Sequence, residues 1–214
     1  MRAAVLLVGL AAWLAGCKEE TAGFNRETLM NPAGEAFKQT APERFRVRFE
    51  TSVGDFTVEV ERALAPTGAD RFYNLVRNGF YHDQRFFRVV PGFVVQWGIH
   101  GDPAISARWE GTGIADEPVR GSNQRGILCF AAASAPNSRT TQVFISLKDN
   151  AYLDGYGFAP FGRVTEGIET VDKLNGEYGE APSKKQNLIQ QQGNRYLQEQ
   201  FPALDYIKAT KLLD

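Results

Sequence analysis

Cysteine, histidine and methionine are scarce in this chain of 214 residues, which has two of each. Two cysteines cannot build a disulfide framework. His82 and His100 lack carboxylate partners at ligand spacing, so no metal site is expected. Basic excess is also missing, with 24 Lys and Arg against 25 Asp and Glu, which argues against a nucleic-acid partner. No G-x-S-x-G nucleophile motif or complete dinucleotide-binding glycine loop occurs, so we expect a protein that works without a cofactor.

The N-terminus is typical of an export signal. Met1-Arg2 gives a positive start, and residues 3–15 form an apolar run too short to span a bilayer as a stable helix. The run closes with Leu14-Ala15-Gly16-Cys17, which resembles a bacterial lipobox. That resemblance implies cleavage after residue 16 and lipid on Cys17, which would anchor the protein to a membrane of the cell envelope, facing the periplasm or the exterior. An ordinary secretory signal with an incidental cysteine is the alternative.

The rest of the chain divides into a spacer and one folded domain. Residues 17–43 are polar, contain Pro32 and Pro42 and show no sustained apolar period, so we predict a flexible tether with at most helical turns near residues 26–30. Residues 44–214 form the predicted domain, with an extended C-terminal segment from about residue 180.

Period-two alternation dominates the start of the domain. Apolar residues alternate with polar ones over 45–49 and 56–60 on either side of Gly54, which predicts an antiparallel hairpin. A helix follows from Pro66 to Asn78-Gly79, with Ala69, Phe72, Leu75 and Val76 on its core face. Further short strands are predicted at 85–90, 94–97, 127–131, 142–146 and 160–165. We then expect a second helix at 167–174, an amphipathic segment at 186–200 and a closing strand within 204–213. Many short strands without a βαβ pattern favour a mainly β protein with a closed or sandwiched antiparallel sheet.

The stretch FFRVVPGFVVQ at residues 86–96 is the most informative motif. It places a guanidinium (Arg88), a primary amide (Gln96) and large apolar side chains on a strand, a Pro-Gly turn and a second strand. Farther on, TTQVFI at 140–145 offers Gln142 and Phe144 on one strand face. Together these motifs resemble the cyclophilin family of peptidyl-prolyl isomerases, over roughly residues 45–164. The resemblance implies a closed eight-stranded antiparallel β-barrel capped by two α-helices.

The resemblance also implies a reaction and a set of site residues. Rotation about an X-Pro bond breaks no bond, so the catalyst needs only to bind the twisted state better than either planar isomer. Arg88 would donate to the prolyl nitrogen, and Gln96 would bind the carbonyl that turns. The pyrrolidine ring and its neighbouring residues would lie against the substrate-binding side chains, which are Phe93, Val94, Ala131, Ala132, Gln142, Phe144, Tyr152, Leu153 and Phe158.

Three of these positions depart from the family pattern and put the peptide preference in doubt. Ala132 stands where many members have Asn, Phe158 where many have His, and Tyr152 where animal members have the Trp that donates its indole N–H to cyclosporin. We expect a monomer that acts on Pro-containing peptides and unfolded exported proteins. The alternative is a lipid-anchored chaperone or scaffold that holds Pro-containing segments without catalysis.

Overall fold

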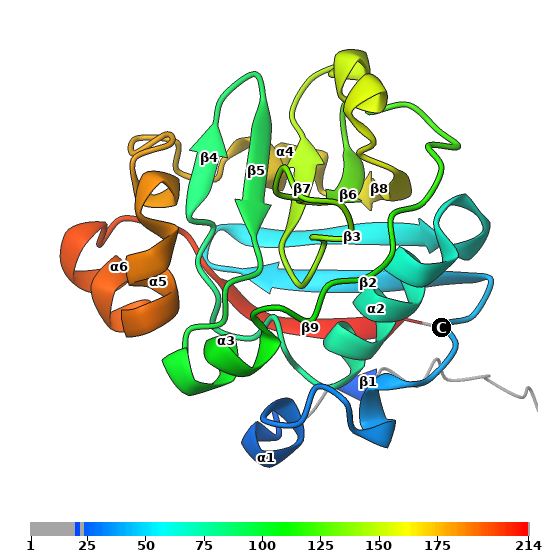
Figure 1. Cartoon of the computed structure of the whole chain (residues 1–214). Helices are drawn as coiled ribbons and strands as arrows, with labels where there is room; N and C mark the ends of the chain where they lie inside the picture. Colours follow the sequence, from blue (N-terminus) through cyan, green and yellow to red (C-terminus); the bar gives the residue numbers. More distant parts are fainter. Residues whose placement is uncertain (1–19, 22–23, 214) are drawn as a thin grey trace, which may run out of the picture.

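A curled antiparallel sheet forms the centre of the computed structural model, which describes residues 20–21 and 24–213 (Figure 1). Within these residues nine strands follow the order β1-β9-β2-β3-β8-β6-β7-β5-β4. The strands are β1 (Glu20–Thr21), β2 (Arg44–Thr51), β3 (Gly54–Glu61), β4 (Arg88–Val90), β5 (Val94–Trp97), β6 (Ile127–Phe130), β7 (Val143–Ser146), β8 (Pro160–Glu166) and β9 (Ile207–Leu213). The helices are α1 (Arg26–Leu29), α2 (Pro66–Arg77), α3 (Pro103–Trp109), α4 (Ile168–Asp172), α5 (Gln186–Gln192) and α6 (Asn194–Gln200). Short 3₁₀ turns complete the set: η1 (Glu35–Phe37), η2 (Arg62–Leu64), η3 (Ala151–Tyr156) and η4 (Pro182–Lys185).

The predicted eight-stranded sheet corresponds to β2–β9, and all of its strand pairs are antiparallel. Its end strands, β4 and β9, meet through a single bridge between Arg85 and Tyr206, just before each strand begins. The backbone N–H of Phe86 also donates to the carbonyl of Asp205 at 3.0 Å. The barrel therefore closes over a few residues rather than along a full ladder.

The first hairpin follows the predicted alternation. Phe49 on β2 is opposite Phe56 on β3, and their rings stack with centroids 4.8 Å apart. Val47 and Val58 form the next same-face pair, and all four side chains are buried. Aromatic pairs of this kind add to the stabilisation from burial alone. Because all four side chains are buried, the hairpin contributes its inner face to the barrel's interior.

Both predicted capping helices are present, and α3 was not predicted. The four apolar residues expected on the core face of α2 are all buried. α4 is shorter than the predicted 167–174: it begins after Gly167, which adopts a left-handed φ of 76°, and it ends at Asp172. α3 is a helix of seven residues that begins at Pro103 behind the N-cap Asp102, whose side chain accepts from the Ala104 N–H.

The chain between α4 and β9 forms two short helices where we predicted one amphipathic segment. α5 and α6 are separated at Gly193, whose φ is +60°. A Cβ at this position would lie 1.9 Å from the carbonyl oxygen of Gly101. The break therefore depends on glycine, and it brings the two helices against the start of α3. The closing strand is present as β9.

Residues 24–43 differ from the predicted tether because they pack against the domain. Leu29 is fully buried, and its carbonyl accepts a 2.9 Å hydrogen bond from the Trp109 indole. Ala41 is also buried, and its N–H donates to the Asp70 carboxylate at 2.8 Å. A few isolated apolar residues are enough for docking when the surface below offers matching hydrogen bonds, and such docking leaves no periodic signal. The predicted signal peptide and Cys17 lie outside the described residues.

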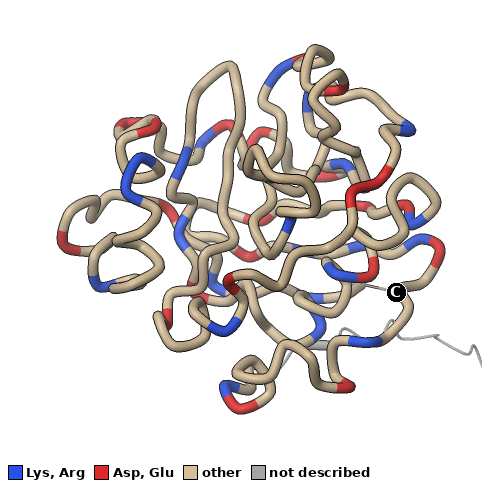
Figure 2. The backbone as a smooth tube through the Cα atoms, viewed as in Figure 1, with Lys and Arg blue, Asp and Glu red and all other residues tan. Residues whose placement is uncertain are grey.

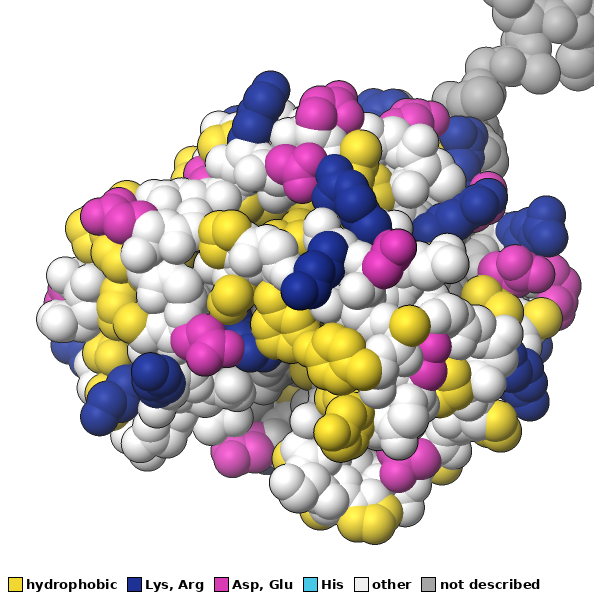
Figure 3. All heavy atoms as spheres, turned by 90° about the horizontal axis from the view of Figure 1, so that it is seen from above, with side chains coloured by type: hydrophobic (Ala, Val, Ile, Leu, Met, Phe, Trp, Pro, Cys, Tyr) yellow, Lys and Arg dark blue, Asp and Glu magenta, His cyan; other side chains and the backbone are white. Residues whose placement is uncertain are grey.

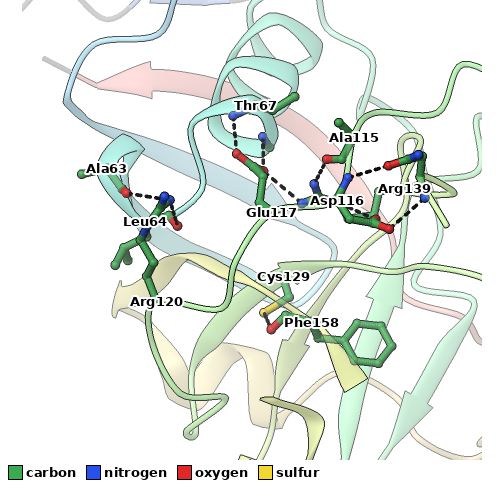
Figure 4. A network of polar contacts seen from close by, with 12 residues as sticks. Ala63, Leu64, Thr67, Ala115, Asp116, Glu117, Arg120, Cys129, Arg139 and Phe158 are labelled. Carbon is green, nitrogen blue, oxygen red and sulfur yellow. Dashed lines mark hydrogen bonds and ion pairs between the residues drawn. The ribbon is translucent and has the colours of Figure 1, made fainter. Parts of the chain in front are cut away.

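A buried polar network holds the long connection between α3 and β6 (Figure 4). The Glu117 carboxylate accepts from the Thr67 and Gly68 N–H groups at the start of α2, at 2.7 and 3.0 Å. It also pairs with Arg139 at 3.1 Å, in a pair whose side chains are 8% and 4% exposed. Arg139 donates in addition to the carbonyl of Ala115. The network thus ties this connection to both α2 and the loop that precedes β7.

Charged residues of both signs are spread along the whole described backbone (Figure 2). This mixture matches the near balance of the composition, with a formal net charge of −1. In the described part of the chain, helices are all too short or too polar to cross a membrane.

Candidate active site

The β4–β5 hairpin places the two predicted catalytic residues opposite each other. Arg88 pairs with Gln96 in the strand register, and the Phe93 N–H donates to the Val90 carbonyl at 2.9 Å to close the turn. Gly92 provides the left-handed residue of this turn, with a φ of 69°. The Pro-Gly signal in the sequence therefore produces the predicted strand-turn-strand.

The same row continues across the sheet. Gln96 on β5 pairs with Phe144 on β7, and Phe144 pairs with Cys129 on β6. Because side chains of directly paired residues lie on the same face of a sheet, the row sets a guanidinium, an amide and an aromatic ring side by side. Three strands, rather than one loop, fix their spacing.

An apolar pocket of about 210 Å³ lies over this row. Val94, Phe144 and Leu153 are buried against Cys129 to form its base, with Phe93, Ala131 and Phe158 packed around them. The Phe158 ring meets Phe144 edge-on, with centroids 5.5 Å apart and planes at 81°. The full lining is Arg88, Phe93, Val94, Gln96, Ala131, Ala132, Phe144, Leu153, Phe158 and Gln186.

Two predicted binding residues lie outside this pocket. Gln142 lines an adjoining groove of about 340 Å³, which shares Ala131, Ala132 and Gln96 with the pocket. Tyr152 stands beside the pocket with 56% of its surface exposed, and its ring stacks on that of Phe93. The structure thus brings the eleven predicted residues into one region, in which nine line the pocket, one lines the groove and one covers Phe93 from outside.

A chain of side-chain hydrogen bonds connects the pocket and the groove. Arg88 Nη1 donates to Gln96 Oε1 at 3.3 Å, and Gln96 Nε2 donates to Gln142 Oε1 at 2.8 Å. Gln142 Nε2 then donates to Gln186 Oε1 at 3.0 Å. Each amide is oriented by its neighbour, so the Gln96 side chain has a defined position before any peptide binds.

Sequence reasoning missed two residues at this site. Glu180 accepts hydrogen bonds from Arg88, and Gln186 lines both the pocket and the groove. Both belong to the segment between α4 and β9, for which the sequence predicted an amphipathic stretch but no contact with the site. Nothing in their local sequence marks them, because a single Glu and a single Gln in a polar stretch are ordinary surface residues.

Cys129 is a buried thiol beneath the pocket. Its Sγ lies 3.1 Å from Asn123 Oδ1. Burial raises the pKa of this thiol well above its usual value, and the nearby Asp154 carboxylate acts in the same direction. The thiol is therefore protonated at neutral pH, which makes it a small core residue rather than a nucleophile.

Figure 3 looks onto the molecule from above, where hydrophobic side chains gather near the middle of the face with charged side chains of both signs around them. Among the described residues, no group of three or more His, Cys, Asp or Glu side chains could hold a metal ion. The site offers one cation, several amides and an apolar pocket, which can bind and polarise an amide group but provide no nucleophile.

Comparison with known proteins agrees with this geometry. Residues 46–193 match the family described as cyclophilin type peptidyl-prolyl cis-trans isomerase/CLD. Peptidyl-prolyl cis-trans isomerase A of Dickeya dadantii is 33% identical over 169 residues, which cover 73% of this chain and 86% of the relative. Peptidyl-prolyl cis-trans isomerase B of Escherichia coli K12 is 34% identical over 138 residues, which cover 61% and 84%.

A crystal structure of a cyclophilin type isomerase from Cryptosporidium parvum shows the same fold. Its TM-score is 0.59 at 23% identity, and the match covers 79% of this chain and 97% of that one. The chain therefore belongs to the cyclophilin-type peptidyl-prolyl cis-trans isomerase family. It is an isomerase of this type, with the fold that the resemblance implied.

Proposed function

We propose that the pocket beside Arg88 holds the proline of an X-Pro segment while the bond before it rotates. The barrier to this rotation, about 18 to 20 kcal/mol, arises because the nitrogen lone pair is delocalised into the carbonyl. In the twisted state the prolyl nitrogen recovers its lone pair. A fixed donor near that nitrogen then stabilises the twisted state more than either planar isomer, and only such a difference accelerates the reaction.

One observation carries this assignment: Arg88, Gln96 and Phe144 lie in one row across β4, β5 and β7. The Arg88 guanidinium is always charged and carries five N–H groups in a planar fork. The pocket next to it has the apolar character that a pyrrolidine ring requires, and the Gln96 amide is held within reach of the carbonyl that turns. The adjoining groove would take the residues that precede the proline.

A short Ala-Pro peptide tests the assignment directly. The Cryptosporidium parvum relative was crystallised in the presence of the dipeptide Ala-Pro, and we propose the same ligand class here. NMR exchange between the cis and trans signals of a Pro-containing peptide reports turnover and affinity together. Arg88→Ala should lower the exchange rate while affinity changes much less. Full exchange in Arg88→Ala would contradict the role of Arg88.

We propose further that the substrates are exported proteins and that the enzyme is anchored in the cell envelope through Cys17. The charged start, the short apolar run and Leu14-Ala15-Gly16-Cys17 support this placement. More than one acyl chain is needed for stable anchoring, and a lipobox signal provides it. Mass spectrometry of protein from its native membranes should show lipid on Cys17, and Cys17→Ser should remain unprocessed. An unmodified Cys17 in the membrane fraction would overturn the anchor without affecting the isomerase assignment.

A further inference from the structure

The segment between α4 and β9 is fixed firmly to the barrel. Ile189, Leu197 and Leu204 are buried against Phe87 and Ile99, which makes a second hydrophobic cluster outside the barrel interior. Phe87 directly precedes Arg88 in the sequence. The cluster therefore connects this segment to the base of the strand that carries the catalytic guanidinium.

Polar contacts fix the same segment at its sharpest turn. The Asn194 N–H donates to the Gly101 carbonyl at 2.9 Å, and Asn194 Nδ2 donates to the carbonyl and the carboxylate of Asp83 at 2.8 and 2.9 Å. Gly193 lies so close to Gly101 that no side chain fits between them. With these contacts on one side and the hydrophobic cluster on the other, the segment has a defined position on the barrel.

This segment presents Glu180 to Arg88. The Glu180 carboxylate accepts from Arg88 Nε at 3.1 Å and also from Arg88 Nη2. Nη1 of the same guanidinium donates to Gln96, and the guanidinium carbon lies 5.2 Å from the centroid of the Phe93 ring. Hydrogen bonds and the charge of Arg88 lower the pKa of Glu180, so the carboxylate is ionised at neutral pH. The guanidinium is thus held by an anion, an amide and a ring.

We propose that Glu180 is a positioning residue for the isomerase reaction. It holds one edge of the Arg88 fork so that the remaining N–H groups stay turned toward the pocket. The pair is partly exposed, at 24% for Arg88 and 46% for Glu180, and exposed ion pairs contribute little to stability. The ion pair therefore acts on the position of the Arg88 guanidinium rather than on stability. A small misplacement of a catalytic group lowers the reaction rate, so rotation about the X-Pro bond is sensitive to this position. This inference rests on the role of Arg88 proposed above.

The test compares Glu180→Ala and Glu180→Gln with Glu177→Ala, which removes an exposed glutamate three residues away in the same segment. Glu180→Ala should lower turnover about tenfold in NMR exchange with little change in peptide affinity, since misplacement of the guanidinium affects mainly the twisted state. Glu180→Gln keeps an acceptor oxygen and should recover most of the loss. Glu177→Ala should match the wild type, and circular dichroism melting should show all three variants folded.

Two further measurements separate positioning from other roles. The Arg88 Nε–H signal should exchange slowly with water in the wild type and quickly in Glu180→Ala. In an Arg88→Ala background, Glu180→Ala should change turnover no further, because Glu180 acts only through Arg88. Higher turnover in Glu180→Ala, an unchanged rate, or a loss of affinity alone would each overturn the proposal. The proposed role of Arg88 fails separately, if Arg88→Ala retains wild-type turnover.

Discussion

Tyr152 stacks on Phe93 at the edge of the pocket, with ring centroids 6.5 Å apart and planes 16° from parallel. By the family resemblance, Tyr152 stands where animal members have a tryptophan whose indole N–H donates to cyclosporin, and a tyrosine has no indole N–H. Tyr152→Trp should therefore tighten cyclosporin about tenfold, since a lost hydrogen bond to a buried acceptor costs roughly 1–3 kcal/mol. Tyr156→Trp is the matched control, because Tyr156 is 75% exposed and lies beyond Tyr152. Equal affinities for both variants, by titration calorimetry, would contradict the placement.

Arg88→Lys separates the geometry of the guanidinium from its charge. Lysine keeps the positive charge but loses the planar fork that contacts Gln96 and Glu180 together. We expect Arg88→Lys to lose at least tenfold in turnover, close to the loss in Arg88→Ala. Near-normal turnover in Arg88→Lys would mean that the charge alone is enough.

Phe144→Ala should weaken peptide affinity as well as turnover, since it removes contacts present in both ground and twisted states.

Glu117→Gln should destabilise the domain strongly. The substitution leaves the Arg139 guanidinium, only 4% exposed, without its closest carboxylate. Breaking a buried ion pair costs about 3 kcal/mol or more. Glu59→Gln is the control, because its partner Arg163 is 65% exposed and the loss should stay below about 1 kcal/mol. Urea unfolding measures both, and similar losses would show that the buried network contributes no more than a surface pair.

His100 should make stability fall in mild acid. Burial lowers its pKa from 6.5 to about 4, although Asp102 and Asp83 oppose this shift. Between these two values the unfolded chain takes up a proton that the folded protein does not, so stability decreases as the pH falls from about 6.5 to about 4. The loss from this group approaches about 3 kcal/mol.

His100→Asn isolates that contribution from the carboxylates, which titrate in both proteins. In the wild type the Asp102 N–H donates a 2.9 Å hydrogen bond to His100 Nδ1. Asparagine keeps an acceptor for this N–H. We expect the unfolding free energies of the two proteins, measured from pH 7.5 to 4, to change differently with pH. As the pH falls, the wild type should lose stability relative to the variant. A constant difference across the range would mean that the pKa of His100 is the same in the folded and unfolded states.

The sequence predicted those parts of the site that depend on local pattern. Arg88 and Gln96 are opposed because a Pro-Gly turn fixes the register of one hairpin, and Phe144 lies on the same strand face as Gln142 because the two are two residues apart. Period two predicted β2 and β3 almost to their ends. Local patterns of this kind can be read from the sequence because the residues that form the strand also determine which of its faces is buried.

Contacts between distant segments left no such signal. Glu180 reaches Arg88 across 92 positions in the chain, and its place depends on how α5 and α6 dock. Docking depends in turn on Gly193, which the sequence presents as an ordinary loop glycine. Leu29 is similar, since one leucine in a polar stretch gives no periodicity, yet it is fully buried under Trp109.

The flanks of the barrel decide where this enzyme can be cut or joined to another protein. The family match spans residues 46–193, whereas β9 extends to Leu213 and pairs with β2 from Arg46 to Thr51. A fragment limited to the matched residues would leave an edge of β2 unpaired and uncover the surface that Leu29 and Ile207 bury. The segment needed for folding is therefore longer than the segment that carries the catalytic residues. A fusion protein that uses this domain has to include the residues on both sides of the family match.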